Sequence, residues 1–448
     1  MSAKRPKRLK MAVLSSTEDA GAVAFPESRR EDTNEGTPLR GNQIMWSSQH
    51  DGWCHLYLYD WKTGELKNQI TKGDWVVRGI ERVDEQTRQI YFFASGREAG
   101  RDPYLRHLYK INFDGTGLFL LTPGHGEHSV TFSPCGRYIV DTYSRVDFAP
   151  VTELRRSSDG QLICELEKAD IELLLAEGWK WPQPFQAKAR DDKTDIYGVL
   201  FRPTNFDPSK KYPVVECIYS GPQSFSTPKA FRPYYGAQSV AELGFLVIMV
   251  DGLGMGGRSK AFHDVQCLTV AGTATFWEIL AGTIKRLRWA WRRGDSGLPD
   301  HIAAMRQLAE KYPYMDLSRV GVYGGSAGGY DAAHALLTHP EFYKVAVATS
   351  GNHDHRLDKA WWVELWMGYP IGDHYILECL TVAGTATSWE ILAGTIKRLR
   401  SAWRRDMLIV PNGQHGLAGD YFDRKRWDYF VKHLLGVEPP DWNSMESQ

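Results

Sequence analysis

The sequence feature that most limits the fold is a glycine-rich serine segment in the C-terminal half of the chain. It runs from Arg319 to Leu337 and reads "RVGVYGGSAGGYDAAHALL". The apolar residues before the glycines are typical of a buried strand, and the alanine- and leucine-rich residues after them are typical of a helix. A strand that turns into a helix across a few glycines indicates an α/β architecture in this part of the chain.

Ser326, at the centre of this segment, is a candidate nucleophile. Gly-x-Ser-x-Gly between a strand and a helix is the pattern of a nucleophile elbow, where a sharp turn leaves no room for bulky neighbours. The N-terminal amides of the following helix, with the backbone N–H near Ala327 among them, would face a developing oxyanion. The alternative is that Ser326 is only a small residue in a structural turn.

A nucleophilic serine also needs a base and an orienting carboxylate. His415 lies in a loop between an apolar run and the terminal helix pattern, where hydrolases of this architecture carry their histidine. The carboxylate should lie between Ser326 and His415, yet none of the acidic residues there follows an apolar strand in the required way. The acidic candidates are Asp354, Asp358, Glu364, Asp373, Glu378, Glu390 and Asp406. The sequence therefore identifies two triad members and no third.

The preceding part of the chain predicts β-hairpins. The segment from His55 to Thr71, "HLYLYDWKTGELKNQIT", returns from His107 to Thr122 as "HLYKINFDGTGLFLLT". Each copy reads strand, glycine-containing turn, strand, and a period of about 50 residues is typical of propeller blades. About three blades fit into this part, whereas a closed ring needs at least about four. We therefore expect an all-β, partial β-propeller-like domain.

After this domain, four apolar runs predict the buried strands of an α/β-hydrolase domain with a doubly wound, mostly parallel sheet. They read "YPVVECIYS", "GFLVIMVDG", "RVGVYG" and "YKVAVATS". Helical spacing in the last helix predicts core packing for Trp427, Phe430, Val431, Leu434 and Leu435. The expected division is a disordered polar tail (1–41), the propeller-like domain (42–178), the hydrolase domain (179–442) and a second tail (443–448).

Two near-identical segments interrupt the hydrolase domain. Residues 267–293 recur as residues 379–405 and differ only at Phe276/Ser388 and Trp289/Ser401. Such close identity indicates a recent duplication or an inserted element. Each copy predicts a helix with an apolar face and a basic side. This pattern predicts surface helices at residues 277–293 and 389–405 that pack on the domain. The alternative is that these helices contact a membrane surface or a partner.

Composition argues against several classes of partner. Lys plus Arg and Asp plus Glu each number 54, so no net field would recruit nucleic acid. The six cysteines form no CxxC pair, which argues against a structural zinc site and against a disulfide framework. We expect no cofactor and no transmembrane segment, and the lack of a visible secretory signal favours a cytoplasmic location.

Several segments, in the same order, resemble the dipeptidyl peptidase IV branch of the prolyl oligopeptidase family. They include "DIYGVLFRPTNFDPSKKYPVVECIYSGPQ", "VDGLGMGGRSKAFHD", "YMDLSRVGVYGGSAGGY", "HPEFYKVAVATSGNHD", "WWVELWMGYP" and "HLLGVEPPDW". The resemblance covers roughly Gln43 to Trp442. It implies an N-terminal β-propeller, a C-terminal α/β-hydrolase domain and the release of dipeptides, usually after proline or alanine, from free N-termini. The expected partner is a peptide substrate, and a homodimer is a further possibility.

The resemblance also implies roles for individual residues. Ser326 matches the nucleophile and His415 the base. Tyr219, in "CIYSGP", matches a tyrosine whose hydroxyl donates to the oxyanion. Trp362, in "WWVELWMG", matches an aromatic wall of the pocket for the penultimate residue. Trp361 and Trp366 compete for that role, and core packing is the other interpretation of all three tryptophans.

The chain departs from the family pattern where the catalytic aspartate should be, because the second copy of the repeat stands there. The propeller is also short, and the paired glutamates that bind a substrate's amino terminus find no match. Loss of the triad aspartate lowers serine protease turnover by about 10⁴. The expected function is therefore an impaired peptidase of the dipeptidyl peptidase IV type. The alternatives are an inactive scaffold that binds peptides or partners and a small-ester hydrolase.

Overall fold

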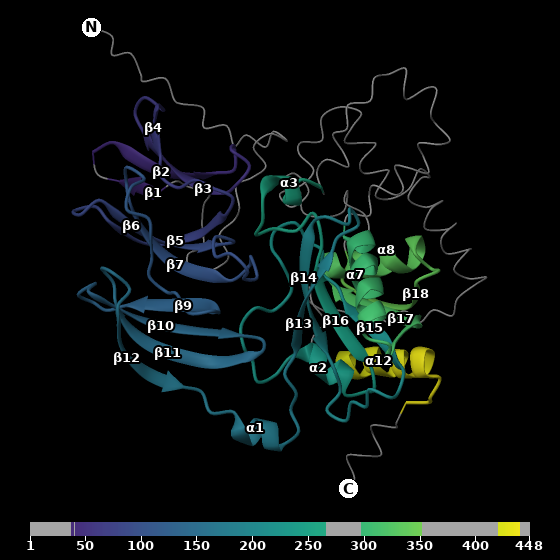
Figure 1. The fold of residues 1–448 in the computed structure, drawn as a ribbon. Coiled ribbons are helices and arrows are strands. Elements are labelled where there is room, and N and C mark those ends of the chain that lie inside the picture. The colour runs from purple at the N-terminus through teal and green to yellow at the C-terminus, as the bar shows by residue number, and fades with distance from the viewer. Residues whose placement is uncertain (1–36, 40, 266–296, 352–419, 440–448) are drawn as a thin grey trace, which may run out of the picture.

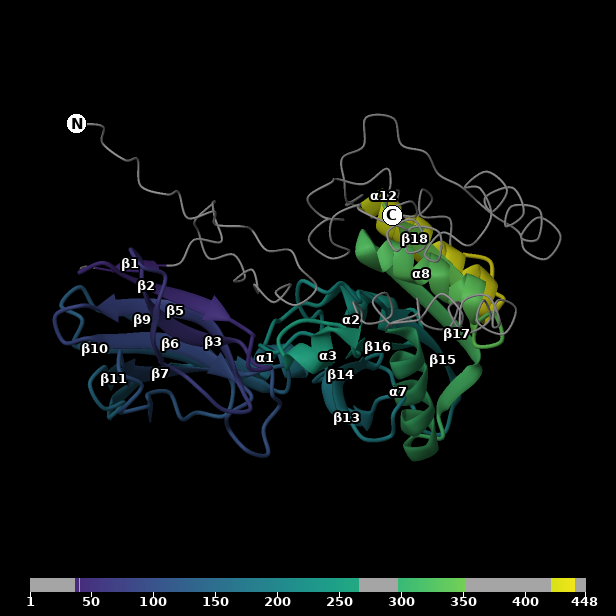
Figure 2. The same ribbon diagram turned by 90° about the horizontal axis from the view of Figure 1, so that it is seen from above.

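The computed structural model describes residues 37–39, 41–265, 297–351 and 420–439. Within these residues an all-β part and an α/β part lie side by side, as Figures 1 and 2 show from two directions. The predicted fold class is confirmed, since an α/β-hydrolase-type sheet follows a partial propeller-like array of sheets. The part that the structure describes contains no helix long and apolar enough to cross a membrane.

The all-β part consists of three antiparallel four-stranded sheets, which are stacked in Figure 1. The first contains β1 (Thr37–Leu39), β2 (Gln43–Ser48), β3 (His55–Asp60) and β4 (Leu66–Gln69). The second contains β5 (Val76–Asp84), β6 (Gln89–Ser95), β7 (Arg106–Asn112) and β8 (Phe119–Leu120). The third contains β9 (Glu127–Phe132), β10 (Tyr138–Arg145), β11 (Phe148–Arg156) and β12 (Leu162–Lys168).

The repeated hairpin forms the third and fourth strands of the first two sheets, which confirms the predicted hairpins. The threonine that ends each copy makes the same hydrogen bond in both sheets. The Thr71 hydroxyl accepts the backbone N–H of Leu56 at 2.9 Å, and the Thr122 hydroxyl accepts that of Leu108 at 2.8 Å. Both threonines are buried. Each copy therefore satisfies an interior backbone amide with its own side chain.

His107 of the second sheet is a buried histidine whose pKa is lowered. Burial, reinforced by the nearby His128, lowers the pKa of His107 to about 3. The neutral ring fits its surroundings, because Nδ1–H donates to the Thr122 carbonyl at 2.9 Å and Nε2 accepts from Arg101 at 3.3 Å. The unfolded chain binds a proton here near the ordinary histidine pKa, so stability is complete above that pKa and falls as the pH is lowered toward the folded value.

We expect this histidine alone to cost the fold about 2 kcal/mol between about pH 7 and about pH 5. Urea unfolding at the two pH values measures the loss, and His107→Gln should reduce the difference because an amide can replace both hydrogen bonds without titrating. An equal pH dependence in the variant would show that other groups cause the acid sensitivity.

The α/β part is built on one six-stranded sheet with the order β13-β14-β16-β15-β17-β18. Its strands are β13 (Gln183–Lys188), β14 (Asp195–Phe201), β15 (Tyr212–Cys217), β16 (Leu246–Asp251), β17 (Met315–Gly325) and β18 (Tyr343–Thr349). The four strands from β15 to β18 are parallel and coincide with the four predicted apolar runs. β14 adds to β16 in the antiparallel direction and β13 completes that edge.

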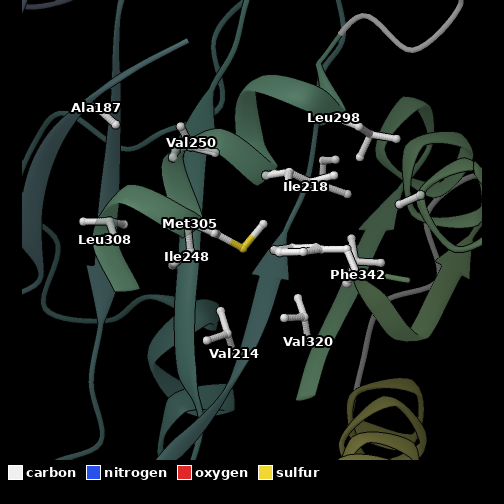
Figure 3. Close-up of a cluster of buried hydrophobic side chains, with 14 of the residues drawn as sticks. Ala187, Val214, Ile218, Ile248, Val250, Leu298, Met305, Leu308, Val320 and Phe342 are labelled. Atoms are coloured by element: carbon white, nitrogen blue, oxygen red, sulfur yellow. The ribbon is translucent and has the colours of Figure 1, made fainter. Parts of the chain in front are cut away.

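Helices cover both faces of this sheet, as a doubly wound sheet requires. The helices described in this part are α2 (Gly236–Ala241), α3 (Lys260–His263), α7 (Leu298–Lys311), α8 (Ala327–Thr338), α12 (Asp420–Phe430) and the π-turn η2 (Val431–Leu435). The short helix α1 (Glu172–Ala176) lies in the connection between β12 and β13 and has no buried residue. One core packs the sheet against α7 and α8, and in Figure 3 Met305 of α7 lies among side chains of the strands. The other core contains α2, α12 and η2. Phe430 and Leu434 are buried there, which confirms the predicted packing face of the last helix.

The loop after β15 connects the two parts of the molecule. The Lys229 ammonium lies 2.9 Å from the Asp102 carboxylate of the second β-sheet region. The backbone N–H of Phe231 donates to the Ser144 hydroxyl of β10 at 3.0 Å. The segment that carries Tyr219 at its start is therefore fixed at its other end against the all-β part.

Candidate active site

Ser326 occupies a strained turn between β17 and α8, with φ 57° and ψ −123°. Such a conformation costs a residue other than glycine about 1–3 kcal/mol and persists only where the surroundings enforce it. Here the Ser326 N–H donates to the Thr349 carbonyl at 3.0 Å, and its carbonyl accepts the Gly329 N–H at 2.9 Å. Strand β18 and the first turn of α8 thus hold the serine in place.

The glycines around Ser326 are required by close backbone contacts. A Cβ on Gly324 would lie 2.3 Å from the Gly328 carbonyl oxygen, and one on Gly328 would lie 2.2 Å from the Ile218 carbonyl oxygen. On Gly329 it would lie 2.3 Å from the Thr349 carbonyl oxygen. Gly325 is different, since its nearest contact would be at 3.9 Å. The packing of the turn against β15 and β18 therefore needs three of the four glycines.

Tyr219 lies just after β15 and contacts Ser326 through its side chain. The Ile218 N–H donates to the Tyr323 carbonyl at 2.9 Å, which places the following residue beside the end of β17. The Tyr219 phenol and the Ser326 side chain share a hydrogen bond. Burial raises the pKa of the phenol above its ordinary value, so Tyr219 is a neutral hydrogen-bond donor at neutral pH.

Two residues that the sequence did not single out support Tyr219. The Gln223 side-chain amide donates to the Tyr219 phenol oxygen at 2.7 Å. The Asp331 carboxylate on α8 accepts the Ser220 N–H at 2.8 Å and so ties the Tyr219 loop to the elbow helix. Neither residue type carries a distinctive local pattern, and the contacts bring separate elements together.

The structure brings together three of the predicted site residues: Ser326, Tyr219 and Ala327. Ala327 is the first residue of α8, where backbone N–H groups have no partner inside the helix. A hydroxyl flanked by a phenol donor and a helix N-terminus suits attack on a carbonyl whose oxygen becomes negative. His415, Trp361, Trp362, Trp366 and the seven acidic candidates from Asp354 to Asp406 lie outside the described residues.

Two family descriptions match the chain. Residues 9–150 match the N-terminal region of dipeptidyl peptidase IV, and residues 286–378 match the prolyl oligopeptidase family. The first match begins inside the segment expected to be a tail. The second ends directly before Cys379, the first residue of the second near-identical segment.

Two curated relatives are named as dipeptidyl peptidases or aminopeptidases. Human dipeptidyl peptidase 8 is 27% identical over 317 residues, which are 68% of this chain and 31% of that protein. The Emericella nidulans protein named "Probable dipeptidyl-aminopeptidase B" is 26% identical over 362 residues, 79% of this chain and 36% of that one. The chain therefore spans about a third of the length of these relatives.

A solved structure has the same fold. Dipeptidyl peptidase 4 of Porphyromonas gingivalis superposes with a TM-score of 0.67 at 22% identity, over 88% of this chain and 55% of that chain. The family matches, the curated relatives and the arrangement of the sheets agree with the motifs read from the sequence. The two family matches and the curated relatives together support the dipeptidyl peptidase IV branch of the prolyl oligopeptidase family as the family of this chain.

Proposed function

We propose that this chain is a serine peptidase of the dipeptidyl peptidase type, with Ser326 as its nucleophile. The observation that carries the proposal is the strained Ser326 conformation together with the hydrogen bond between Ser326 and Tyr219. Strain at a serine that touches a second polar side chain is typical of a catalytic position and has no evident structural benefit. The relatives named for dipeptidyl peptidase activity support the same reaction class.

In the proposed reaction the Ser326 hydroxyl oxygen attacks the scissile carbonyl carbon while His415 takes its proton. The carbonyl oxygen becomes an oxyanion, which accepts hydrogen bonds from the Tyr219 phenol and the Ala327 N–H. His415 then protonates the leaving amine, and water releases the acyl group from Ser326. We propose Trp362, Trp361 or Trp366 as the wall of the pocket that binds the residue before the scissile bond.

We further propose cleavage after proline or alanine near a free N-terminus, with reduced turnover. The reduction follows from the missing triad aspartate, because a histidine without its carboxylate loses its tautomer and orientation. The sequence also predicts, as an alternative, contact with a membrane surface or a partner through residues 277–293 and 389–405. A homodimer is a further prediction from the sequence.

Hydrolysis of a Gly-Pro chromogenic amide tests the proposal. We expect measurable turnover that falls by about a hundredfold or more in Ser326→Ala, since the variant lacks the nucleophile. A small ester run in parallel separates peptidase from esterase specificity. Equal rates in wild type and Ser326→Ala for both substrates would remove the nucleophile and leave the scaffold interpretation.

A further inference from the structure

The phenol of Tyr219 is held by a glutamine four residues further along the same loop. The Gln223 Nε2 donates to the phenol oxygen at 2.7 Å, and both side chains are half-buried. Gly221 lies between them, and a Cβ there would lie 2.4 Å from the Gln223 amide oxygen and 2.7 Å from Cε1 of Tyr219. The absence of a side chain at Gly221 therefore lets the amide reach the ring.

The direction of this hydrogen bond decides what the phenol can do. A phenol has a single O–H proton and accepts through its oxygen lone pairs. Because the Gln223 amide donates, the phenol oxygen accepts through one of its own lone pairs, and the phenol O–H can donate to another acceptor. If an acceptor replaced the amide N–H, the phenol O–H would donate to it instead.

We propose that Gln223 is a positioning residue for the oxyanion site: its amide orients the Tyr219 ring and keeps the phenol proton free to donate to the substrate oxygen. The inference rests on the proposed function of Ser326. One oxyanion donor contributes about 10²–10³ in kcat. Loss of its orientation, with the donor itself still present, should cost a smaller factor of about ten.

The electrostatics of Tyr219 agree with this role. Burial raises the pKa of the phenol, while the hydrogen bond from Gln223 acts in the opposite direction. Asp331 of α8 is the charged group that acts on the phenol within the described residues, and it raises the pKa further. Removal of the Gln223 donor should therefore raise the phenol pKa.

The first test does not need an active enzyme. Tyr219 is replaced by meta-fluorotyrosine in the full chain, and its ionisation is followed by fluorine NMR. We expect the pKa at this position to be higher in Gln223→Met than with Gln223 present, and unchanged in Ser224→Ala, a control in the same loop. Equal titration with and without Gln223 would overturn the proposal.

The second test separates positioning from general structural support. We expect Gln223→Met to lower kcat for the ester about tenfold with little change in KM, and to have no further effect in a Tyr219→Phe background. A similar loss in that background would contradict a role through Tyr219.

Gln223→Glu provides a pH readout. The ionised carboxylate would accept the phenol proton, so kcat relative to wild type should be lowest above the glutamate pKa and recover below about pH 4. A relative kcat that does not change with pH would count against the proposal. If the wild-type protein hydrolyses no substrate, the proposed function fails, and the fluorine titration still decides whether Gln223 sets the state of Tyr219.

Discussion

Gly328→Ala is expected to destabilise the fold by about 2–3 kcal/mol and to remove the reactivity of Ser326. On helix propensity alone, alanine at this position in α8 should stabilise the protein by about 1 kcal/mol. Sterics reverse the sign, because the new Cβ would lie 2.2 Å from the Ile218 carbonyl oxygen. That oxygen belongs to the backbone at the end of β15 and cannot move without displacing Tyr219. Urea unfolding and the rate of fluorophosphonate labelling measure the two effects.

Gly325→Ala is the matched control for this prediction. Gly325 is also adjacent to Ser326, but it is exposed, and its Cβ would meet nothing closer than the Thr349 carbonyl oxygen at 3.9 Å. We expect stability within about 0.5 kcal/mol of wild type and unchanged labelling. If the two alanine variants behaved alike, the close packing of the elbow would not be the reason for its glycines.

Glu216→Leu is expected to destabilise the α/β part by about 3–5 kcal/mol. Glu216 is fully buried on β15, where one carboxylate oxygen contacts Nδ1 of His301 and the other accepts the Tyr343 hydroxyl at 2.7 Å. Leucine would remove both interactions and leave two buried polar groups without their acceptor. Urea unfolding at about pH 6 measures the loss, since the raised pKa of His301 keeps that ring protonated at this pH.

The double variant Glu216→Leu with His301→Leu distinguishes the pair from simple packing. Burial alone would lower the pKa of His301, but the Glu216 carboxylate outweighs it and the pKa is raised. The stabilisation is therefore complete below the ordinary histidine pKa and is lost as the pH rises through the raised value. We expect the double variant to recover part of the stability lost in Glu216→Leu. A double variant less stable than the single one would show that packing, and not the unpaired histidine, dominates.

Local patterns explain how much of the fold was predictable. Strands β15 and β16 and the second half of β17 are buried along most of their length, so each reads as an apolar run. In β18 only Tyr343 and Val345 are buried, and its valines and alanines give the fourth run. The hairpins of the first two sheets carry turn glycines and a repeated threonine, which are also local. Strands β13 and β14 were not predicted, because their place in the sheet depends on pairing with β16 across a long loop.

The same contrast applies to the site. Ser326 and Ala327 follow from a short pattern of glycines, and Tyr219 came from the resemblance to a family. Gln223 and Asp331 were missed because both types are common on surfaces, and their role depends on which elements the fold brings together. Neither the sequence after β15 nor the sequence of α8 indicates by itself that the two segments are in contact.

Labelling of the folded protein with a fluorophosphonate, followed by peptide mapping, tests the central claim most directly. A strained serine that touches a phenol donor should react as a nucleophile even with an incomplete triad. The predicted result is an adduct on Ser326 that disappears in Ser326→Ala and forms more slowly in Tyr219→Phe. Two results would contradict the claim. One is folded wild-type protein with no adduct on Ser326, and the other is Ser326→Ala labelled to the same extent at another residue.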